Sequence, residues 1–228
     1  MTTNSTRNLR PVIALAAALG LSACAATETA TFDVPASRNI APTTAVNAPV
    51  EAPEAAIAPS YKVVATYVTV PETLKVSEAN RYYPSGDIVW REDPPGNRHE
   101  QVKAIVEAGL KKGTDELDGD RAVVLDVVVS RFHALTEKAR YTVGGVHAVQ
   151  FTMMVRDAET GEVLMDPHFV KADFPALGGQ EAVEAEANGI TQKVRIVDHL
   201  AFVIGEELGK AAGYAERDNG LVGAINQL

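Results

Sequence analysis

The only cysteine of the 228-residue chain, Cys24, is the residue whose surroundings say most about its chemistry. It comes shortly after an uncharged apolar run, Pro11 to Leu21, and that run follows a short segment with Arg7, Arg10 and no acid. A basic start, an apolar stretch and small residues before a cleavage point are the three parts of an export signal. The run has 11 residues, whereas a membrane-spanning helix needs about 20. We therefore expect a removable signal and not a membrane span.

The four residues Leu21 to Cys24, L-S-A-C, resemble the lipobox of bacterial lipoproteins. In that family the cysteine thiol takes a diacylglycerol through a thioether, the signal is cut before the cysteine, and the new amine is acylated. The resemblance implies cleavage between Ala23 and Cys24 and lipidation of Cys24; plain secretion with an incidental cysteine is the alternative. A lone cysteine cannot form an internal disulfide, and acylation removes a free thiol from an exported domain.

The residue after Cys24 is Ala25 and not an aspartate. Under the sorting rule of some Gram-negative bacteria, this resemblance implies transfer to the outer membrane, with the domain facing the periplasm. The sequence thus divides into a lipoprotein signal peptide (1–23), a lipidated cysteine with a linker (24–60) and a single periplasmic domain (61–228). The linker is rich in Ala, Thr and Pro, and its prolines leave no helical or strand period, so we expect it to be disordered. An early strand around Thr31–Val34 is the alternative.

The formal net charge of the chain is −9, and removal of Arg7 and Arg10 with the signal makes the mature chain −11. An acidic protein of this kind is poorly suited to bind nucleic acid or an anionic membrane surface. The 168 residues after the linker are enough for one domain with a sizeable core. We therefore expect contact with the membrane only through the lipid on Cys24, and no nucleic-acid partner.

Motifs of common enzymes are missing from the sequence: there is no G-x-S-x-G, no G-x-G-x-x-G, no P-loop and no S-x-x-K. His99 and Glu100 begin an H-E-x-x-H pattern, but Lys103 stands where the second histidine belongs. Three histidines on or beside successive strands could approach one another, with two aspartates as companions: His133, His147, His168, Asp166 and Asp198. A metal or catalytic site there is the alternative to ordinary surface histidines. We expect no enzyme activity, no metal and no cofactor.

A loop from Asn80 to Gly96 is the best candidate for a functional surface. It reads N-R-Y-Y-P-S-G-D-I-V-W-R-E-D-P-P-G and contains the only tryptophan. Aromatic and arginine side chains are the types that anchor protein interfaces, so the candidate partner-binding residues are Arg81, Tyr82, Tyr83, Trp90 and Arg91. The alternative is that Trp90 and one tyrosine pack onto the core.

The elements that must position these residues follow from periodicity, caps and turn residues. Short extended pieces are expected around Thr73–Ser77 and Asp87–Trp90. Gly109 lies within the apolar stripe of the first helix and suggests close packing against the sheet. The main predicted elements are a strand Tyr61–Val70, a helix Asn97–Gly113 capped by Asn97, strands Arg121–Arg131, Tyr141–Arg156 and Val163–Ala172, and a helix Gln192–Ala212 capped by Thr191.

This order predicts an α+β domain with an antiparallel sheet of about four or five strands. Two main helices would pack mainly on one face of the sheet, in the order β(β)-α-β-β-β-α. In the third strand the odd positions from Val123 to Val129 are all apolar and should face the core. The opposite face is half apolar, which suggests that it is partly covered.

The whole chain resembles uncharacterised lipoproteins of alphaproteobacteria in L-S-A-C, in the segment L-K-V-S-E-A-N-R-Y-Y-P-S-G-D-I-V-W (residues 74–90) and in the helix that follows. Its layout is similar, more loosely, to small periplasmic α+β lipoproteins that assist envelope machines, such as activators of peptidoglycan synthases and auxiliary subunits of lipid transporters. The resemblance implies a membrane-anchored, non-enzymatic accessory or binding subunit with an envelope protein as partner. A carrier or sensor of a lipid or other small apolar ligand is the alternative, and a hydrolase is the third reading.

Overall fold

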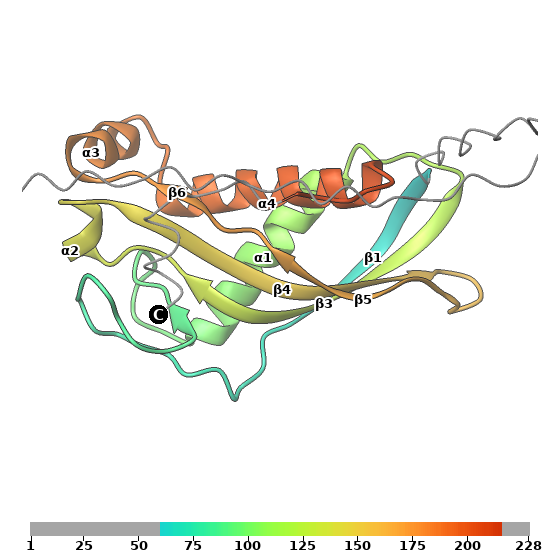
Figure 1. Cartoon of the computed structure of the whole chain (residues 1–228), viewed down its shortest axis with the longest axis horizontal. Helices are drawn as coiled ribbons and strands as arrows, with labels where there is room; N and C mark the ends of the chain where they lie inside the picture. The colour runs from blue at the N-terminus through green and yellow to red at the C-terminus, as the bar shows by residue number, and fades with distance from the viewer. Residues whose placement is uncertain (1–59, 216–228) are drawn as a thin grey trace, which may run out of the picture. The chain divides into compact units, whose positions relative to one another are not determined.

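The computed structural model describes residues 60–215 (Figure 1). Ala23, Cys24, the signal and nearly all of the linker lie outside these residues, so cleavage, lipidation and a disordered linker stay predictions. In the described part of the chain, no helix combines the length and the apolar character that a bilayer crossing requires.

The described residues form six strands and four helices, and the main elements expected from the sequence are all present. Two helices and one short strand, α2, α3 and β6, are additional. The elements in chain order are β1 (Tyr61–Thr69), β2 (Ile88–Val89), α1 (Arg98–Thr114), β3 (Arg121–His133), α2 (Glu137–Arg140), β4 (Gly145–Asp157), β5 (Val163–Lys171), β6 (Phe174–Ala176), α3 (Gly179–Ala187) and α4 (Gln192–Gly209).

The α+β class is confirmed, but the sheet is mixed and not purely antiparallel. Its main path is β1-β3-β4-β5; β2 pairs with the end of β3, and β6 pairs with the start of β4. Both β1 and β2 run parallel to β3, whereas β4 is antiparallel to β3 and β5 to β4. The cause is α1, which lies between β1 and β3 in the chain and returns it to the same end of the sheet, as parallel pairing requires.

The start of β4 differs from the expectation. The long strand predicted from Tyr141 begins only at Gly145, because α2 and a turn precede it and Gly144 takes a φ of 73° in that turn. The polar, Ala-rich stretch after residue 178 forms the short helix α3. β5, which contains Pro167, lies at the edge of the main path of the sheet, where a residue without a backbone N–H is tolerated.

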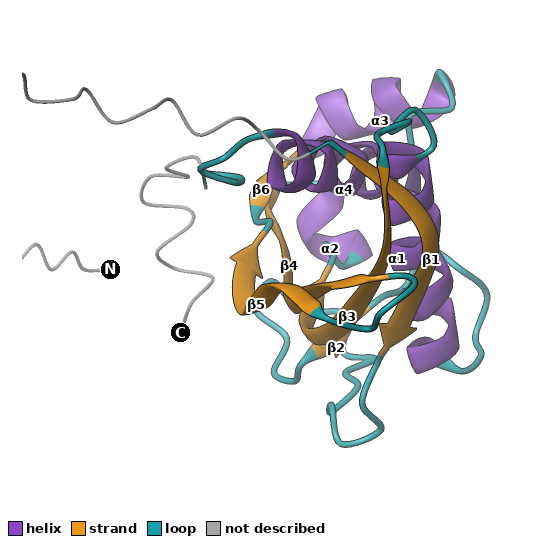
Figure 2. Ribbon diagram, turned by 90° about the vertical axis from the view of Figure 1, so that its right-hand side faces the viewer, coloured by secondary structure: helices purple, strands orange, loops and turns teal. Residues whose placement is uncertain are grey.

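The core lies between the sheet and the two long helices, α1 and α4, which pack side by side (Figure 2). The predicted inward row of β3 is confirmed, since Val123, Leu125, Val127 and Val129 are all buried. The matching row of β4 (Val149, Phe151, Met153 and Val155) is buried as well. Both predicted helix caps are present: the Asn97 carboxamide oxygen accepts from the backbone N–H groups of His99 and Glu100, and the Thr191 hydroxyl accepts from that of Val194.

Glycines of α1 allow the close contact with α4. A Cβ atom at Gly109 would lie 2.6 Å from the Cβ of Leu200, and one at Gly113 would lie 2.3 Å from the carbonyl oxygen of Ala201. Gly109 therefore packs closely against α4 and not, as expected from the sequence, against the sheet. α1 also extends one residue beyond the expected end at Gly113.

Gly113→Ala is expected to lower the free energy of unfolding by about 1–3 kcal/mol, because the new methyl group would overlap the backbone of α4. Gly205, on the facing helix, is the matched control. A Cβ there has its nearest neighbour at 3.9 Å, so Gly205→Ala should raise the stability by about 0.5–1 kcal/mol through helix propensity alone. Urea denaturation measures both changes, and equal effects at the two positions would rule out the proposed close packing.

Candidate partner-binding site

The aromatic loop, residues 80–96, is the surface singled out by the sequence, and the structure separates its residues into two groups. Arg81, Tyr82 and Tyr83 are exposed, the two tyrosines to 41% and 68%. Trp90 is fully buried, and the Arg91 side chain is only 23% exposed. The aromatic side chains that the loop exposes are thus the two tyrosines near its start, while Pro94, Pro95 and Gly96 are exposed at its end.

Trp90 cannot contribute to a surface, so its assignment as a partner-binding residue is wrong. Its ring meets Phe132 edge-on at a centroid distance of 5.8 Å, and its indole N–H donates to Asp93 Oδ2 at 2.8 Å. The burial follows from its position directly after the fully buried strand β2. Packing of Trp90 onto the core is therefore confirmed, while both tyrosines remain at the surface.

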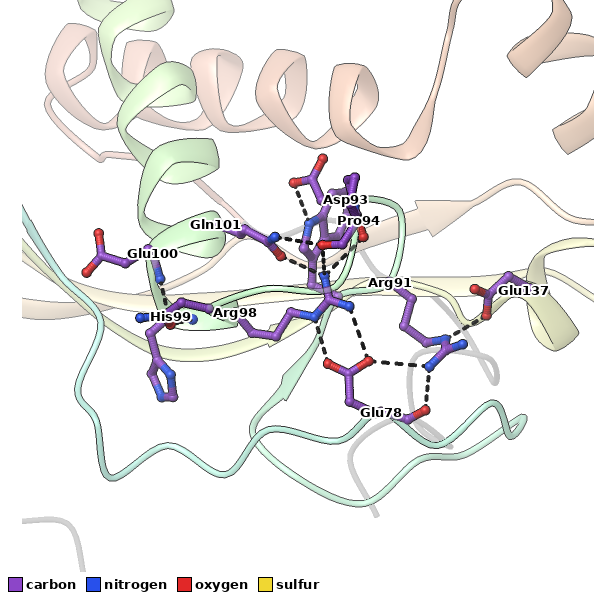
Figure 3. A network of polar contacts seen from close by, with 11 residues as sticks. Glu78, Arg91, Asp93, Pro94, Arg98, His99, Glu100, Gln101 and Glu137 are labelled. Atoms are coloured by element: carbon purple, nitrogen blue, oxygen red, sulfur yellow. Dashed lines mark hydrogen bonds and ion pairs between the residues drawn. The ribbon is translucent and has the colours of Figure 1, made fainter.

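Two arginines and two glutamates fix the aromatic loop to the helices (Figure 3). Glu78 lies between the arginines: Arg98 donates to its two oxygens at 2.7 and 3.2 Å, and Arg91 is 3.4 Å from Oε2. Arg91 also donates to Glu137 Oε2 at 2.7 Å and to the backbone carbonyl of Glu78. The network therefore joins the start of α1, the start of α2 and the segment before the aromatic loop.

Arg98 is the central group of this network, because its side chain is only 5% exposed and its guanidinium is shared among several acceptors. Besides Glu78, it donates to the carbonyl oxygens of Asp93 and Pro94 at 3.1 and 3.3 Å and to Gln101 Oε1 at 2.7 Å. The hydrogen bond from Arg98 holds the pKa of Glu78 below its usual value, against a smaller opposing effect of burial. Glu78 therefore remains an anion and keeps both arginines engaged.

A second set of contacts holds the exposed end of the loop on α2. The Lys138 backbone N–H donates to Asn80 Oδ1 at 2.9 Å, and the Thr136 hydroxyl donates to the Arg81 carbonyl at 2.8 Å. The Lys138 ammonium lies 4.7 Å from the centre of the Tyr82 ring. Tyr82 and Tyr83 are thus presented on a loop that is fixed before and behind them, which reduces the entropy lost when a partner binds.

The three histidines considered for a metal or catalytic site, His133, His147 and His168, each have separate surroundings. His133 Nε2 lies 2.9 Å from the Gly86 carbonyl oxygen, and His168 Nε2 lies 3.3 Å from Glu207 Oε2, while His147 is buried beside Phe174. Asp198, one of the proposed companions, accepts from Lys112 at 2.6 Å. Residues 60–215 hold no group of three or more His, Cys, Asp or Glu placed to bind a metal ion.

The face of the sheet away from the helices is an apolar surface that the sequence analysis did not single out. Tyr67, Val128 and Phe169 are exposed on it to 61%, 44% and 57%. The register brings Val128 opposite Thr152, and Thr152 opposite Phe169, so the last residue lies on the same face two strands away. The expectation that the opposite face of β3 is partly covered holds for Ala122, Val124 and Asp126, which are half-buried, but not for Val128 and Ser130, which are exposed. Alternation in each strand could have shown which of its residues share a face. The order of the strands, which brings these residues together on one surface, could not be read from the sequence.

Comparisons with known proteins place the chain in a family but give it no activity. The model of a family of unknown function, DUF6778, matches residues 61–224. None of the curated proteins matches the chain significantly.

Similar solved structures include a Xanthomonas campestris protein of the family DUF330, at 10% identity over 67% of this chain and 85% of that one, with a TM-score of 0.40. A candidate lipoprotein of Caulobacter crescentus is 14% identical over 50% and 83%, with a TM-score of 0.29. A lipoprotein of Neisseria meningitidis is 16% identical over 42% and 62%, with a TM-score of 0.18. Scores this low assign neither fold nor function. The match over most of the chain shows that this protein belongs to the family of unknown function DUF6778.

Proposed function

We propose that this protein is a lipid-anchored lipoprotein whose domain serves as a non-enzymatic binding subunit for a protein of the cell envelope. The observation that carries the proposal is the presentation of Tyr82 and Tyr83, exposed to 41% and 68%, on a loop held by ion pairs and hydrogen bonds. Tyrosine combines a large apolar ring with a hydroxyl group and loses little entropy on binding, which suits it to protein interfaces.

The anchor is part of the same proposal. The L-S-A-C sequence at the end of an export signal supports a diacylglycerol on Cys24, and Ala25 supports sorting to the outer membrane with the domain on the periplasmic side. The net charge supports a protein and not a nucleic acid as the partner.

The test is cross-linking of the full chain in cells, followed by purification from the solubilised envelope and identification of the captured proteins. Replacement of both Tyr82 and Tyr83 by serine is expected to reduce capture of the partner by about 10-fold or more, since interface tyrosines often contribute at least 1.4 kcal/mol. Cys24→Ala should release the chain from the membrane fraction.

Tyr141→Ser is the matched control, because Tyr141 is similarly exposed, at 47%, but lies outside the aromatic loop. It should leave capture unchanged. Equal capture by the native chain and by the double serine variant, with both folded, would show that the loop does not bind the partner.

A further inference from the structure

A small cavity lies beneath α3, between that helix, the end of α2 and the starts of β4 and α4. It is bordered by two arginines, a histidine, a glutamine and apolar side chains, among them Arg140, His147, Ala182, Gln192 and Arg195. The space open to the centre of a water molecule is about 10 Å³, which is close to the minimum for one water-sized group. A single oxygen atom can therefore enter, but not a larger ligand as a whole.

His147 is the unusual member of this cavity. It is fully buried, and neither of its ring nitrogens has a hydrogen-bond partner among the described residues. A buried imidazole in this state loses its hydration without compensation, and such groups in native proteins usually have a partner. The low dielectric surroundings and the positive charges of Arg195 and Arg140 lower the pKa of His147 to about 3, so the ring is neutral and one nitrogen is a donor.

Arg195 supplies a positive charge that is not neutralised in the described part of the chain. Its guanidinium donates to the Pro175 carbonyl at 2.9 Å and lies 5.5 Å from the centre of the Phe174 ring, but forms no ion pair with a described carboxylate. The His147 ring contacts the same Phe174 at 4.9 Å. The charge of Arg140, in contrast, is neutralised, because Glu92 and Glu186 lie 3.3 and 3.1 Å from its guanidinium.

The helix over the cavity, α3, is attached to the domain mainly at its surface. Glycines with positive φ stand at both of its ends, Gly179 at 56° and Gly189 at 78°, and Ala182 is the only buried residue of the helix. Glu186 fastens it to Arg140, and the Tyr141 hydroxyl donates to Glu186 at 3.1 Å. Because α3 buries so little, the side of α3 is the route by which an anion would enter the cavity.

We propose that this cavity is an anion-binding site, in which one oxygen of a phosphate or carboxylate group accepts hydrogen bonds from His147 and Arg195 beneath α3. The anion would give the His147 imidazole the hydrogen-bond partner, and the Arg195 guanidinium the negative charge, that the described residues do not supply. Phosphate and carboxylate share this oxygen chemistry, and the arms of the experiment separate them. The site does not involve Tyr82 or Tyr83 and does not rest on the proposed partner.

The test uses the full chain in detergent micelles, with ¹⁵N-labelled histidine, at about pH 7.5, where the imidazole of His147 is neutral. Inorganic phosphate and acetate are titrated separately to about 50 mM, a range that covers millimolar dissociation constants, at ionic strength held constant with chloride. The ring ¹⁵N signals of His147 should shift and saturate with at least one anion. Those of His133 and His168 should not, because they lie outside the cavity.

Arg195→Gln is expected to weaken binding by about 10-fold or more, since it removes a charge-assisted hydrogen bond. Arg121→Gln is the control, because Arg121 is an arginine with a half-exposed side chain at the start of β3. Saturation by phosphate alone, or by acetate alone, would support the site and identify the class of anion. The proposal is overturned if neither anion shifts the His147 signals, or if Arg195→Gln binds as the native chain does.

Discussion

Between about pH 6.5 and pH 5, the free energy of unfolding of the domain is expected to fall by about 3 kcal/mol, with a slope that steepens toward about 2.7 kcal/mol per pH unit at the acid end of this range. The reason is that two histidines are held neutral in the fold: the pKa of His147 is lowered to about 3 and that of His133 to about 4. A fall of this size is a large fraction of the roughly 5–15 kcal/mol by which folded domains are stable.

The free energy of unfolding falls as the pH falls because the unfolded chain binds more protons than the folded domain. In the unfolded chain both histidines have a pKa of about 6.5 and are protonated below it, whereas the folded domain leaves them neutral. Unfolding therefore binds two protons in this range, and acid favours the unfolded chain. The contribution of the two neutral histidines to stability is fully present well above pH 6.5. It is lost as the pH falls from there toward their pKa values in the folded domain.

The causes of the two shifts differ in detail. Burial is the largest cause for both, and for His147 the charges of Arg195 and Arg140 add to it. For His133 the charge of Arg131 adds to burial, while the hydrogen bond to the Gly86 carbonyl opposes it. His133 therefore keeps a partner for its ring, whereas His147 has none within residues 60–215.

Urea denaturation at closely spaced pH values measures the slope. His147→Leu and His133→Gln should each halve it between pH 6.5 and 5, and the double variant should remove most of it. Carboxylates with lowered pKa values, such as Asp157 at about 2, contribute only at lower pH. A slope that persists unchanged in the double variant would show that other groups cause the loss of stability.

The position of His147 illustrates what the sequence could predict and what it could not. The buried row of β4 runs from Val149 to Val155, and His147 has the same parity two residues earlier, so alternation alone predicts that it faces inward. Its neighbours were not predictable, because Phe174 and Arg195 come from a short strand and a helix that follow much later in the chain. Periodicity assigns a face, but contacts between distant elements depend on topology.

The parallel pairing of β1 and β3 was partly predictable in the same way. A strand, a helix and a strand in succession, with 17 residues in the helix, suit a parallel crossover as well as an antiparallel sheet. The aromatic loop was less predictable, since its order depends on ion pairs that join Arg98 to Glu78, 20 residues earlier, and Arg91 to Glu137, 46 residues later. Residue types identified the loop, but not which of its side chains are buried.

Replacement of Arg98 by methionine is expected to lower the free energy of unfolding by about 2–4 kcal/mol and to release the aromatic loop from α1. The substitution keeps much of the apolar stem but removes the ion pair with Glu78 and the hydrogen bonds to the carbonyl groups of Asp93 and Pro94. Breaking a fully buried pair costs about 3–5 kcal/mol, and the value here is smaller because the Glu78 side chain is 53% exposed.

Arg121→Met is the matched control for charge and size. The Arg121 side chain pairs with Asp157 and Glu162 but is 50% exposed, so its loss should cost less than about 1 kcal/mol. Amide hydrogen exchange then separates the loss of stability of the whole domain from the release of the aromatic loop in Arg98→Met. If the contacts of Arg98 hold the loop, exchange should accelerate more in residues 75–90 than in β3 and β4. The buried side chains of those two strands belong to the core and do not depend on Arg98.

The same variant connects the fold to the proposed function. Tyr82 and Tyr83 keep their chemistry in Arg98→Met, so any loss of partner capture would come from the disorder of the loop and not from missing contacts. Capture should fall, and less than in the variant that lacks both tyrosines. Faster exchange in the loop without any loss of capture would mean that the partner does not require an ordered loop, and the binding surface would then be sought on the exposed sheet face around Tyr67 and Phe169.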